Sequence, residues 1–537
     1  MKPQPPVTKM RIAARTSSAT DAALAESPSW GRCQTRAREI DWTPWLIVAL
    51  GAFLRIFLLA IKPPHFDEGI NGWFVDQMTK NGFYRYDPTN YHGPLHFYIL
   101  FVSQTLFGRN LWALRMPVVL GSIFCIWLTT RYEPVVGKTV SRCAALAMAV
   151  SPGFVFYGRY SIHEVWLLLS QMLFILGLLG LWRTGIRRYL WCAGMGLMGM
   201  ILTKETYIIH VGCAAIALLV AWLSHKITPA ENTRPAKQTW TYLDLAVIAC
   251  VGIASVIFFY SGTFMNWAGV KGLIATFDAW FKTGHNGNGH EKPWYYWLTL
   301  IGRYELAIGF GLLACAACQL FRNIAIRYLA IYGVGVLLAY SIVHYKTPWC
   351  IISIVWPLLF LFGAGITLLP ERYGRATTFI AGLLLLMSLV QSIRLNYFRC
   401  TTDTEPYVYV QTYNDIWKLT DPLLKLAKRN PLAYQLVGHM IRTSAYPLPW
   451  ILGDFPRIGY YEKDNLPNTL DADFLLVQED KVAVVEPKLK GSYYTMPLTI
   501  RPYQDTSKLY LSAKIFKDFF PGQVPEFAGP EAAVAHP

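Results

Sequence analysis

Long apolar runs are the feature that most restricts the fold of this chain. A helix needs about 20 mostly apolar residues to cross a bilayer, and such runs recur along more than half of the sequence. Charged residues make up only 15% of the 537 residues, whereas about 25% is usual for a soluble domain. The sequence therefore predicts a mainly α, polytopic helical bundle in the membrane. Eleven spans are predicted, at about 43–61, 111–130, 143–157, 164–182, 189–203, 207–224, 243–260, 297–319, 328–344, 349–369 and 376–394.

Basic residues predict how these spans are oriented. Lys and Arg are abundant in the leader before the first span, and a basic loop follows every even-numbered span up to the tenth. Because such loops stay on the cytoplasmic side, we expect a cytoplasmic N-terminus in an inner or plasma membrane. The net charge of +16 comes largely from these segments, so it does not indicate a nucleic-acid partner. The loop residues are Arg131, Lys138, Arg142, Arg183, Arg187, Arg188, Lys226, Arg234, Lys237, Arg322, Arg327, Arg372 and Arg375.

Hydropathy divides the chain into three predicted domains. Residues 1–42 form a basic cytoplasmic leader that we expect to be disordered, and residues 43–395 form the transmembrane domain with external loops 62–110 and 261–296. Residues 396–537 form an external, or periplasmic, soluble α/β domain. Alternating runs there predict strands over 407–413, 472–479 and 492–500, with helix at 421–427. Amphipathic surface helices are predicted over 69–80 and 94–107, and 284–294 is either a substrate loop or a disordered connector.

Adjacent carboxylates follow the first span, in the sequence HFDEG (65–69). Transfer of a group onto a hydroxyl needs a base that removes the proton, and a carboxylate suits this role. Asp67 and Glu68 are therefore the catalytic candidates, with His65 beside them. The alternative is an ordinary solvated acidic turn, or a helix cap in which Asp67 precedes an amphipathic helix.

Four further motifs carry polar residues at the ends of predicted spans, namely NYHGPLHFY (90–98), YGRYSIHE (157–164), LTKETY (202–207) and HYKTPW (344–349). Ionisable groups at membrane depth are costly and are usually functional or paired. The alternatives are a salt bridge or snorkelling for Arg159, a capped bend at 204–205, and an aromatic-belt turn around Lys346. The candidate substrate-binding residues are His65, His92, Arg159, Glu164, Lys204, Glu205, His344 and Lys346.

All five motifs fall on the same predicted side of the membrane. That orientation was determined from the basic loops alone. The position of the five motifs on one side is therefore an independent observation. Carboxylates, cations and His residues would then meet around one cleft at the external end of the bundle. Such a cleft suits a reaction between a lipid phosphate held in the membrane and a polar acceptor.

Taken together, these motifs resemble the GT-C superfamily of membrane glycosyltransferases, including the protein O-mannosyltransferases and the lipid A aminoarabinose transferases. The resemblance is greatest to a branch labelled "flippase activity-associated". It extends over about residues 43–510 and includes YPLPWILGDFPRIGYY (446–461) in the tail.

This resemblance implies a polyprenyl-phosphate sugar as donor and, because a single displacement occurs, inversion at the anomeric carbon. The acceptor is the hydroxyl of a lipid, a glycan or a protein; a protein is not implied, because the tail differs from those of the mannosyltransferases. The resemblance also implies that Asp67 is the general base and that Glu68 orients the acceptor or the sugar. Arg159, Lys204 and Lys346 are the candidates for binding the leaving phosphate. No cofactor is specified; a divalent cation would have to bind Asp67, Glu68 and His65 or His92, and oxygen ligands would favour Mg²⁺ or Mn²⁺.

Two other functions compete with the glycosyltransferase. One is a lipid-linked-sugar flippase or accessory subunit without catalysis, and the other is a membrane sensor whose external domain binds a glycan. Secondary transporters often contain internal repeats, and the sequence has none that we can detect. Replacement of Asp67 by Ala separates these functions, because it should abolish only a chemical step.

Overall fold

A computed structural model describes residues 41–90, 92–231, 238–286, 289–368, 371–462, 465–525 and 527–528. The predicted leader (1–42) therefore lies almost entirely outside the described residues. Seven helical stretches within these ranges are long and apolar enough to cross a membrane. They are α4 (Leu111–Thr130) extended by α5 (Glu133–Val136), α8 (Glu164–Thr184), α10 (Tyr207–Ile227), α11 (Tyr242–Tyr260), α15 (Ile324–Ile342), α16 (Ile351–Leu368) and α17 (Gly374–Ile393).

Shorter or interrupted helices occupy the other four predicted spans. Helix α1 covers Thr43–Ile56 and α9 covers Arg187–Thr203. The third predicted span is divided into α6 (Lys138–Val150) and α7 (Pro152–Tyr157), and the eighth into α13 (Tyr296–Tyr304) and α14 (Leu306–Cys315). The sequence thus located the helical stretches correctly, but only seven of the eleven satisfy the length and hydropathy expected of a complete span.

The two interruptions meet at a buried carboxylate. Pro152 cannot donate a backbone hydrogen bond, and Ser151 caps the new helix instead. Glu305, between α13 and α14, accepts hydrogen bonds from the Ser151 hydroxyl (2.6 Å) and the Gly153 amide (2.7 Å). The carboxylate therefore satisfies donors that the break in the other helix exposes.

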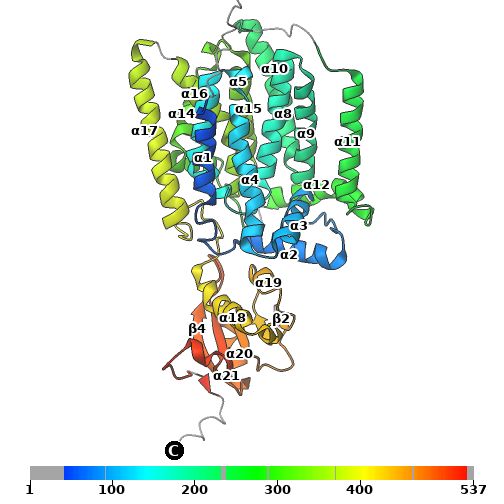
Figure 1. Ribbon diagram of the computed structural model, residues 1–537, viewed down its shortest axis with the longest axis vertical. Helices are drawn as coiled ribbons and strands as arrows, with labels where there is room; N and C mark the ends of the chain where they lie inside the picture. Colours follow the sequence, from blue (N-terminus) through cyan, green and yellow to red (C-terminus); the bar gives the residue numbers. More distant parts are fainter. Residues whose placement is uncertain are drawn as a thin grey trace, which may run out of the picture. The chain divides into compact units, whose positions relative to one another are not determined.

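The long helices lie side by side in a bundle, with α11 and α17 at its edges (Figure 1). Helix α16 is enclosed by its neighbours, whereas α11 leaves nearly all of its apolar side chains uncovered. A helix that is apolar on every side and uncovered by protein is stable only in lipid. The protein is therefore a multi-pass integral membrane protein.

Non-spanning helices connect to one end of this bundle. Helix α2 (Phe66–Asn81) begins directly after α1 and its following turn, and α3 (Leu95–Phe107) packs beside it. Helix α12 (Ala268–Asn286) lies in the second long loop. The first two confirm the helices predicted over 69–80 and 94–107.

A mixed sheet forms the core of the C-terminal region. Its strand order is β2-β1-β3-β5-β4-β6, in which β1 pairs with β2 and β3 in parallel and the remaining pairs are antiparallel. The strands are β1 (Gly438–Ile441), β2 (Ile458–Tyr461), β3 (Phe474–Gln478), β4 (Ser492–Leu498), β5 (Ser507–Ser512) and β6 (Phe527–Ala528). Its helices are α18 (Trp417–Arg429), α19 (Leu448–Ile451), α20 (Glu479–Val485) and α21 (Ala513–Phe516).

The predicted strand over 407–413 is wrong, because this segment forms turns and irregular backbone. Its side chains pack against the helical bundle. The Tyr407 ring stacks on Tyr304, with 4.2 Å between ring centroids, and Gln411 donates a 3.0 Å hydrogen bond to the Pro63 carbonyl. The alternating pattern reflects burial against helices, which a period of two cannot distinguish from burial in a sheet.

Candidate active site

Asp67 lies in the first turn of α2, where His65 holds the backbone. The Nδ1 atom of His65 accepts a hydrogen bond from the Asp67 amide (3.1 Å), so the ring proton resides on Nε2, which donates to the Tyr409 carbonyl (2.9 Å). Burial lowers the pKa of His65, which keeps this imidazole neutral. The Asp67 carboxylate is 3.6 Å from Nδ1 and its side chain is 29% exposed. A partly exposed carboxylate can meet a substrate.

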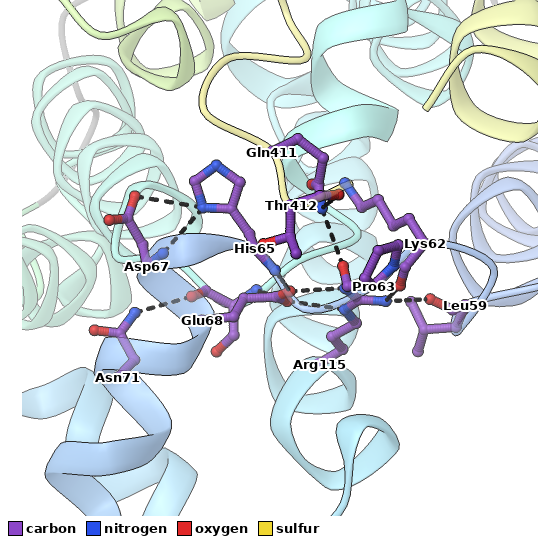
Figure 2. Close-up of polar contacts among 11 residues, drawn as sticks. Leu59, Lys62, Pro63, His65, Asp67, Glu68, Asn71, Arg115, Gln411 and Thr412 are labelled. Atoms are coloured by element: carbon purple, nitrogen blue, oxygen red, sulfur yellow. Dashed lines mark hydrogen bonds and ion pairs between the residues drawn. The ribbon is translucent and has the colours of Figure 1, made fainter. Parts of the chain in front are cut away.

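Glu68 has a different environment from its neighbour. Its two oxygens form a bidentate pair with Arg115 of α4 at 2.8 and 2.7 Å, and both side chains are fully buried. They also accept backbone hydrogen bonds from His65 (2.9 Å) and Ser161 (2.8 Å). Burial opposes ionisation, but the Arg115 guanidinium holds the Glu68 pKa below its usual value. Figure 2 shows Glu68 turned toward Arg115 and Asp67 turned toward His65.

Basic residues from distant segments interact electrostatically with Asp67. The Arg501 guanidinium carbon lies 3.6 Å from the centroid of the Phe66 ring, next to Asp67 in the chain. Its Nε atom is buried and has no hydrogen-bond partner in the described part of the chain. Burial lowers the pKa values of Arg501 and His290, while the charge of Asp67 acts in the opposite direction on both. The charges of Lys292 and Arg501 also lower the pKa of His290, so the neutral His290 ring shares one electrostatic environment with these two cations.

A second polar cluster joins two other motifs. Lys204 forms a buried ion pair with Glu164 and lies 3.9 Å from the Cys350 sulfur. Glu205 is 3.2 Å from Nδ1 of His92. A cavity next to these residues is lined by His92, Lys204, Glu205, Thr347, Trp349 and Tyr340, among others. The Trp349 ring also contacts the His65 ring, at 5.9 Å between centroids, which links this cavity to the surroundings of Asp67.

Gly93 explains how the second cluster forms. Its amide donates a 3.0 Å hydrogen bond to the Thr203 carbonyl, and His92 forms an antiparallel bridge with Lys204. A Cβ atom at residue 93 would lie 2.3 Å from the Leu202 carbonyl oxygen. Only glycine permits this approach between the two motifs.

Arg159 forms hydrogen bonds with the C-terminal end of α1. Its Nη1 and Nη2 atoms donate to the carbonyls of Leu54 (2.9 Å), Phe57 (2.8 Å) and Leu58 (2.8 Å). The guanidinium also stacks over the Tyr397 ring, 4.8 Å from its centroid. The geometry is that of a side chain satisfying the orphan carbonyls of a helix C-terminus.

The HYKTPW motif orders part of the second long loop. The backbone amide of Lys346 donates to the His290 carbonyl (3.0 Å), and the Lys292 amide donates to the His344 carbonyl (3.2 Å). The Lys346 ammonium donates to the Lys292 carbonyl (3.2 Å) and to the Val343 carbonyl. His344 itself is exposed. Of the predicted 284–294 loop, the part from residue 290 onward is therefore held near Asp67, while residues 287–288 lie outside the described residues.

The residues proposed for a divalent cation do not fit one. Both Glu68 oxygens are occupied by Arg115 and backbone amides, and His92 belongs to the other cluster. Within the described ranges, no group of three or more His, Cys, Asp or Glu side chains is arranged to hold a metal ion.

Sequence reasoning missed the residues that the fold brings from afar. Arg115 lies inside a predicted span, where an ionisable residue was a usable signal. His290 and Lys292 were within the loop singled out as a possible substrate loop. Arg501 and Tyr409 carried no local signal, because only the folding of the C-terminal region places Tyr409 against His65 and Arg501 over Phe66, the two residues that precede Asp67 in the chain.

Residues 91–259 match the model of the dolichyl-phosphate-mannose-protein mannosyltransferase family. His92, Arg159, Glu164, Lys204 and Glu205 are within the matched region, whereas Asp67 precedes it. The comparison with curated proteins returned no match.

Solved structures give a likeness over most of the chain. The crystal structure of ArnT from Cupriavidus metallidurans bound to undecaprenyl phosphate is 14% identical, with a TM-score of 0.58, and covers 88% of this chain and 99% of that one. The apo state of the same protein has a TM-score of 0.53 at 14% identity, covering 88% and 98%. The Archaeoglobus fulgidus oligosaccharyltransferase, in complex with Zn and sulfate, is 11% identical, with a TM-score of 0.48 and coverage of 88% and 73%. The chain thus has an ArnT-like fold and, over residues 91–259, is similar to the dolichyl-phosphate-mannose-protein mannosyltransferases.

Proposed function

We propose that this protein is a membrane glycosyltransferase that moves a sugar from a polyprenyl-phosphate donor to a hydroxyl acceptor. The observation that carries the proposal is the placement of Asp67, a partly exposed carboxylate held at a helix start, whose charge acts on Arg501 and on His290, with Lys292 acting on the same His290. A base near the cations Arg501 and Lys292 suits attack on a sugar attached to a phosphate. The family match and the ArnT-like fold support the same class of reaction.

The residues divide the reaction between them. Asp67 accepts the proton of the acceptor hydroxyl as its oxygen bonds to the anomeric carbon. The bond between that carbon and the phosphate oxygen breaks, and the electron pair leaves with the polyprenyl phosphate, whose charge the nearby cations stabilise. One displacement occurs, so the configuration inverts. His65, Glu68 and Arg115 position Asp67 and do not contact the substrate.

A transfer assay separates this enzyme from the alternative, a flippase or accessory protein without catalysis. Purified protein in nanodiscs is given radiolabelled undecaprenyl-phosphate sugars and a membrane extract as the source of acceptor. We expect labelled product and a matching amount of free undecaprenyl phosphate. A flippase would move the donor between leaflets in proteoliposomes and release no lipid phosphate. Intact donor after incubation with every sugar supplied would overturn the proposal.

Donor binding should depend on Arg501 more than on Arg159, because the Arg159 guanidinium already donates to carbonyls at the end of α1. A charged hydrogen bond contributes about 1.5–3 kcal/mol, so Arg501→Met should raise the KM for the donor about ten-fold or more. Arg457 is exposed in the same region, and Arg457→Met is the matched control that should leave the KM unchanged. Steady-state kinetics with undecaprenyl-phosphate sugar measures both. If neither Arg501→Met nor Lys292→Met changes the KM for the donor, the phosphate is bound elsewhere.

The orientation of the bundle remains a prediction from the basic loops. We propose that the N-terminus is cytoplasmic and that the Asp67 site is external. A membrane-impermeant thiol reagent should label a Cys introduced within 284–290 in intact cells and should not label one within 230–238. The native Cys residues are first replaced by Ser or Ala. Labelling in the opposite pattern would reverse the topology and place the reaction in the cytoplasm.

A further inference from the structure

A second cleft, distinct from the cavity beside Lys204, lies between α2 and the segment 446–461. It has a volume of about 720 Å³, which is within the range of small-molecule sites. Four of its lining residues, Trp73, Asp76, Gln77 and Lys80, are spaced along α2 so that they share one face of the helix. The opposite wall comes from the motif YPLPWILGDFPRIGYY, to which neither the reaction nor the helical bundle assigns a role.

Close packing fixes the two walls relative to each other. A Cβ atom on Gly69 would lie 2.5 Å from Pro447, and one on Gly72 would lie 2.4 Å from Trp450. These glycines therefore let the 446–461 segment rest directly on α2. Arg109 joins the same elements, with a bidentate pair to Asp76 (2.9 Å each), a 3.4 Å contact to Asp454 and a hydrogen bond to the Trp450 carbonyl.

The lining of the cleft has the chemistry of a carbohydrate site. The Trp73, Tyr446 and Tyr460 rings present apolar faces with polar tips, which suit the mixed apolar and polar faces of a sugar ring. Tyr460 is 41% exposed, which leaves its ring available. Asp76, Asp454 and Glu462 supply carboxylate oxygens, which only accept hydrogen bonds and so pair with sugar hydroxyls.

One buried group in the lining lacks a partner. The Gln104 side chain is 9% exposed, and its Nε2 atom has no hydrogen bond within the described residues. Leaving a buried amide donor unsatisfied costs about 1–3 kcal/mol. A ligand oxygen in the cleft would satisfy this donor.

The cleft also adjoins the proposed reaction site. The Tyr446 ring contacts the Phe66 ring, with 6.0 Å between centroids, and Arg501 covers the face of the same Phe66. Phe66 precedes Asp67 in the chain. A ligand held in the cleft would therefore have one end close to the proposed base.

We infer that this cleft binds the saccharide part of the acceptor, as a neutral or amino-sugar chain whose reacting hydroxyl extends toward Asp67. This inference rests on the proposed function. An acidic saccharide is disfavoured, because the three lining carboxylates outnumber the two cations, Lys80 and Arg109. Binding of the non-reacting sugars positions the hydroxyl for attack.

The test is direct binding to a glycan array, with the full chain in nanodiscs and no donor present. We expect binding to at least one neutral or amino glycan above the background of empty nanodiscs. Trp73→Ala and Tyr460→Ala should each lower that affinity about ten-fold or more. Trp267 is 60% exposed and does not line the cleft, so Trp267→Ala is the matched control and should bind normally.

Several outcomes would overturn the inference. These are binding to acidic glycans or to peptides alone, no binding at all, or undiminished affinity in both cleft variants. Thermal melts and gel filtration check that the variants fold, and Tyr460 tests the cleft even if Trp73→Ala is unstable. Asp67→Asn should keep full glycan binding while losing transfer. Failure of the proposed function would instead appear as intact donor and no transfer by the natural protein, whatever the cleft binds.

Discussion

Asp67→Asn should lower the rate of sugar transfer by at least about 10²-fold and leave donor binding near normal. The amide keeps the size and shape of the carboxylate but cannot accept the proton of an attacking hydroxyl. General-base catalysis typically contributes about 10²–10⁴-fold in rate. The backbone hydrogen bond from the Asp67 amide to His65 survives the change, because it does not involve the side chain. Single-turnover kinetics in nanodiscs measures the chemical step separately from release of product.

The matched control for this prediction is Asp76→Asn, a carboxylate on the same helix that pairs with Arg109. It lies in the acceptor cleft, so its loss should raise the KM for the acceptor and leave the rate at saturation largely intact. A turnover in Asp67→Asn close to that of the natural protein would contradict the assignment of the base. Normal turnover in both Asp67→Asn and Glu68→Gln would contradict an enzymatic role for HFDEG.

Glu68→Gln should destabilise the protein by about 3–5 kcal/mol. Removing one partner of a buried ion pair leaves the other charge uncompensated, and Arg115 is fully buried. We expect a melting temperature several degrees lower, measured by fluorescence-detected gel filtration after heating. Glu486→Gln is the control, because its pair with Lys508 is partly exposed and such pairs contribute only about 0–1 kcal/mol.

Catalysis should also fall in Glu68→Gln, but by less than in Asp67→Asn, because Glu68 acts by positioning its neighbour. The double variant Glu68→Gln with Arg115→Met removes the uncompensated charge and should recover part of the lost stability. It should not recover the lost turnover, because the α2 start is no longer anchored to α4. Unchanged melting in Glu68→Gln would show that the pair contributes nothing to the fold.

The same pair gives stability a pH dependence of defined sign. The folded pKa of Glu68 is lower than its usual value of 4.5. The contribution of the pair is therefore fully present above pH 4.5 and is lost as the pH falls through the lower folded pKa. The Glu68→Gln variant lacks this carboxyl, so the difference in melting temperature between it and the natural protein should shrink in that range.

Periodicity and length predicted the helical bundle well, because lipid-facing helices must be apolar over their whole length. They could not predict where a helix would break. The interruption at Ser151 is stabilised by Glu305, more than 150 residues away, and no local pattern contains that information. The strand predicted at 407–413 failed for a similar reason, since burial against helices and burial in a sheet both favour alternating apolar residues.

The candidate site, too, could be predicted only in part from the sequence. HFDEG identified a helix start with two carboxylates, but the sequence could not separate their environments, which depend on Arg115 from α4. Lys204 and Glu164 were both selected as candidates, and the fold pairs them with each other. Arg159 was a candidate for the leaving phosphate, and in the structure its guanidinium donates to the carbonyls of Leu54 and Leu58 at the end of the first helix. The sequence thus showed which ionisable residues near lipid need a partner, but the partner of each one depends on the fold.

The hydrogen bonds from His65 to Tyr409 and from Gln411 to Pro63 have a consequence for biosynthesis. The ribosome makes Asp67 early, yet its surroundings are completed by residues that emerge more than 300 positions later, up to Arg501. A nascent chain with every span inserted would still lack these groups. The protein therefore acquires its proposed activity only after residue 501 has been made, and chains released before that point would occupy the membrane without consuming donor lipid.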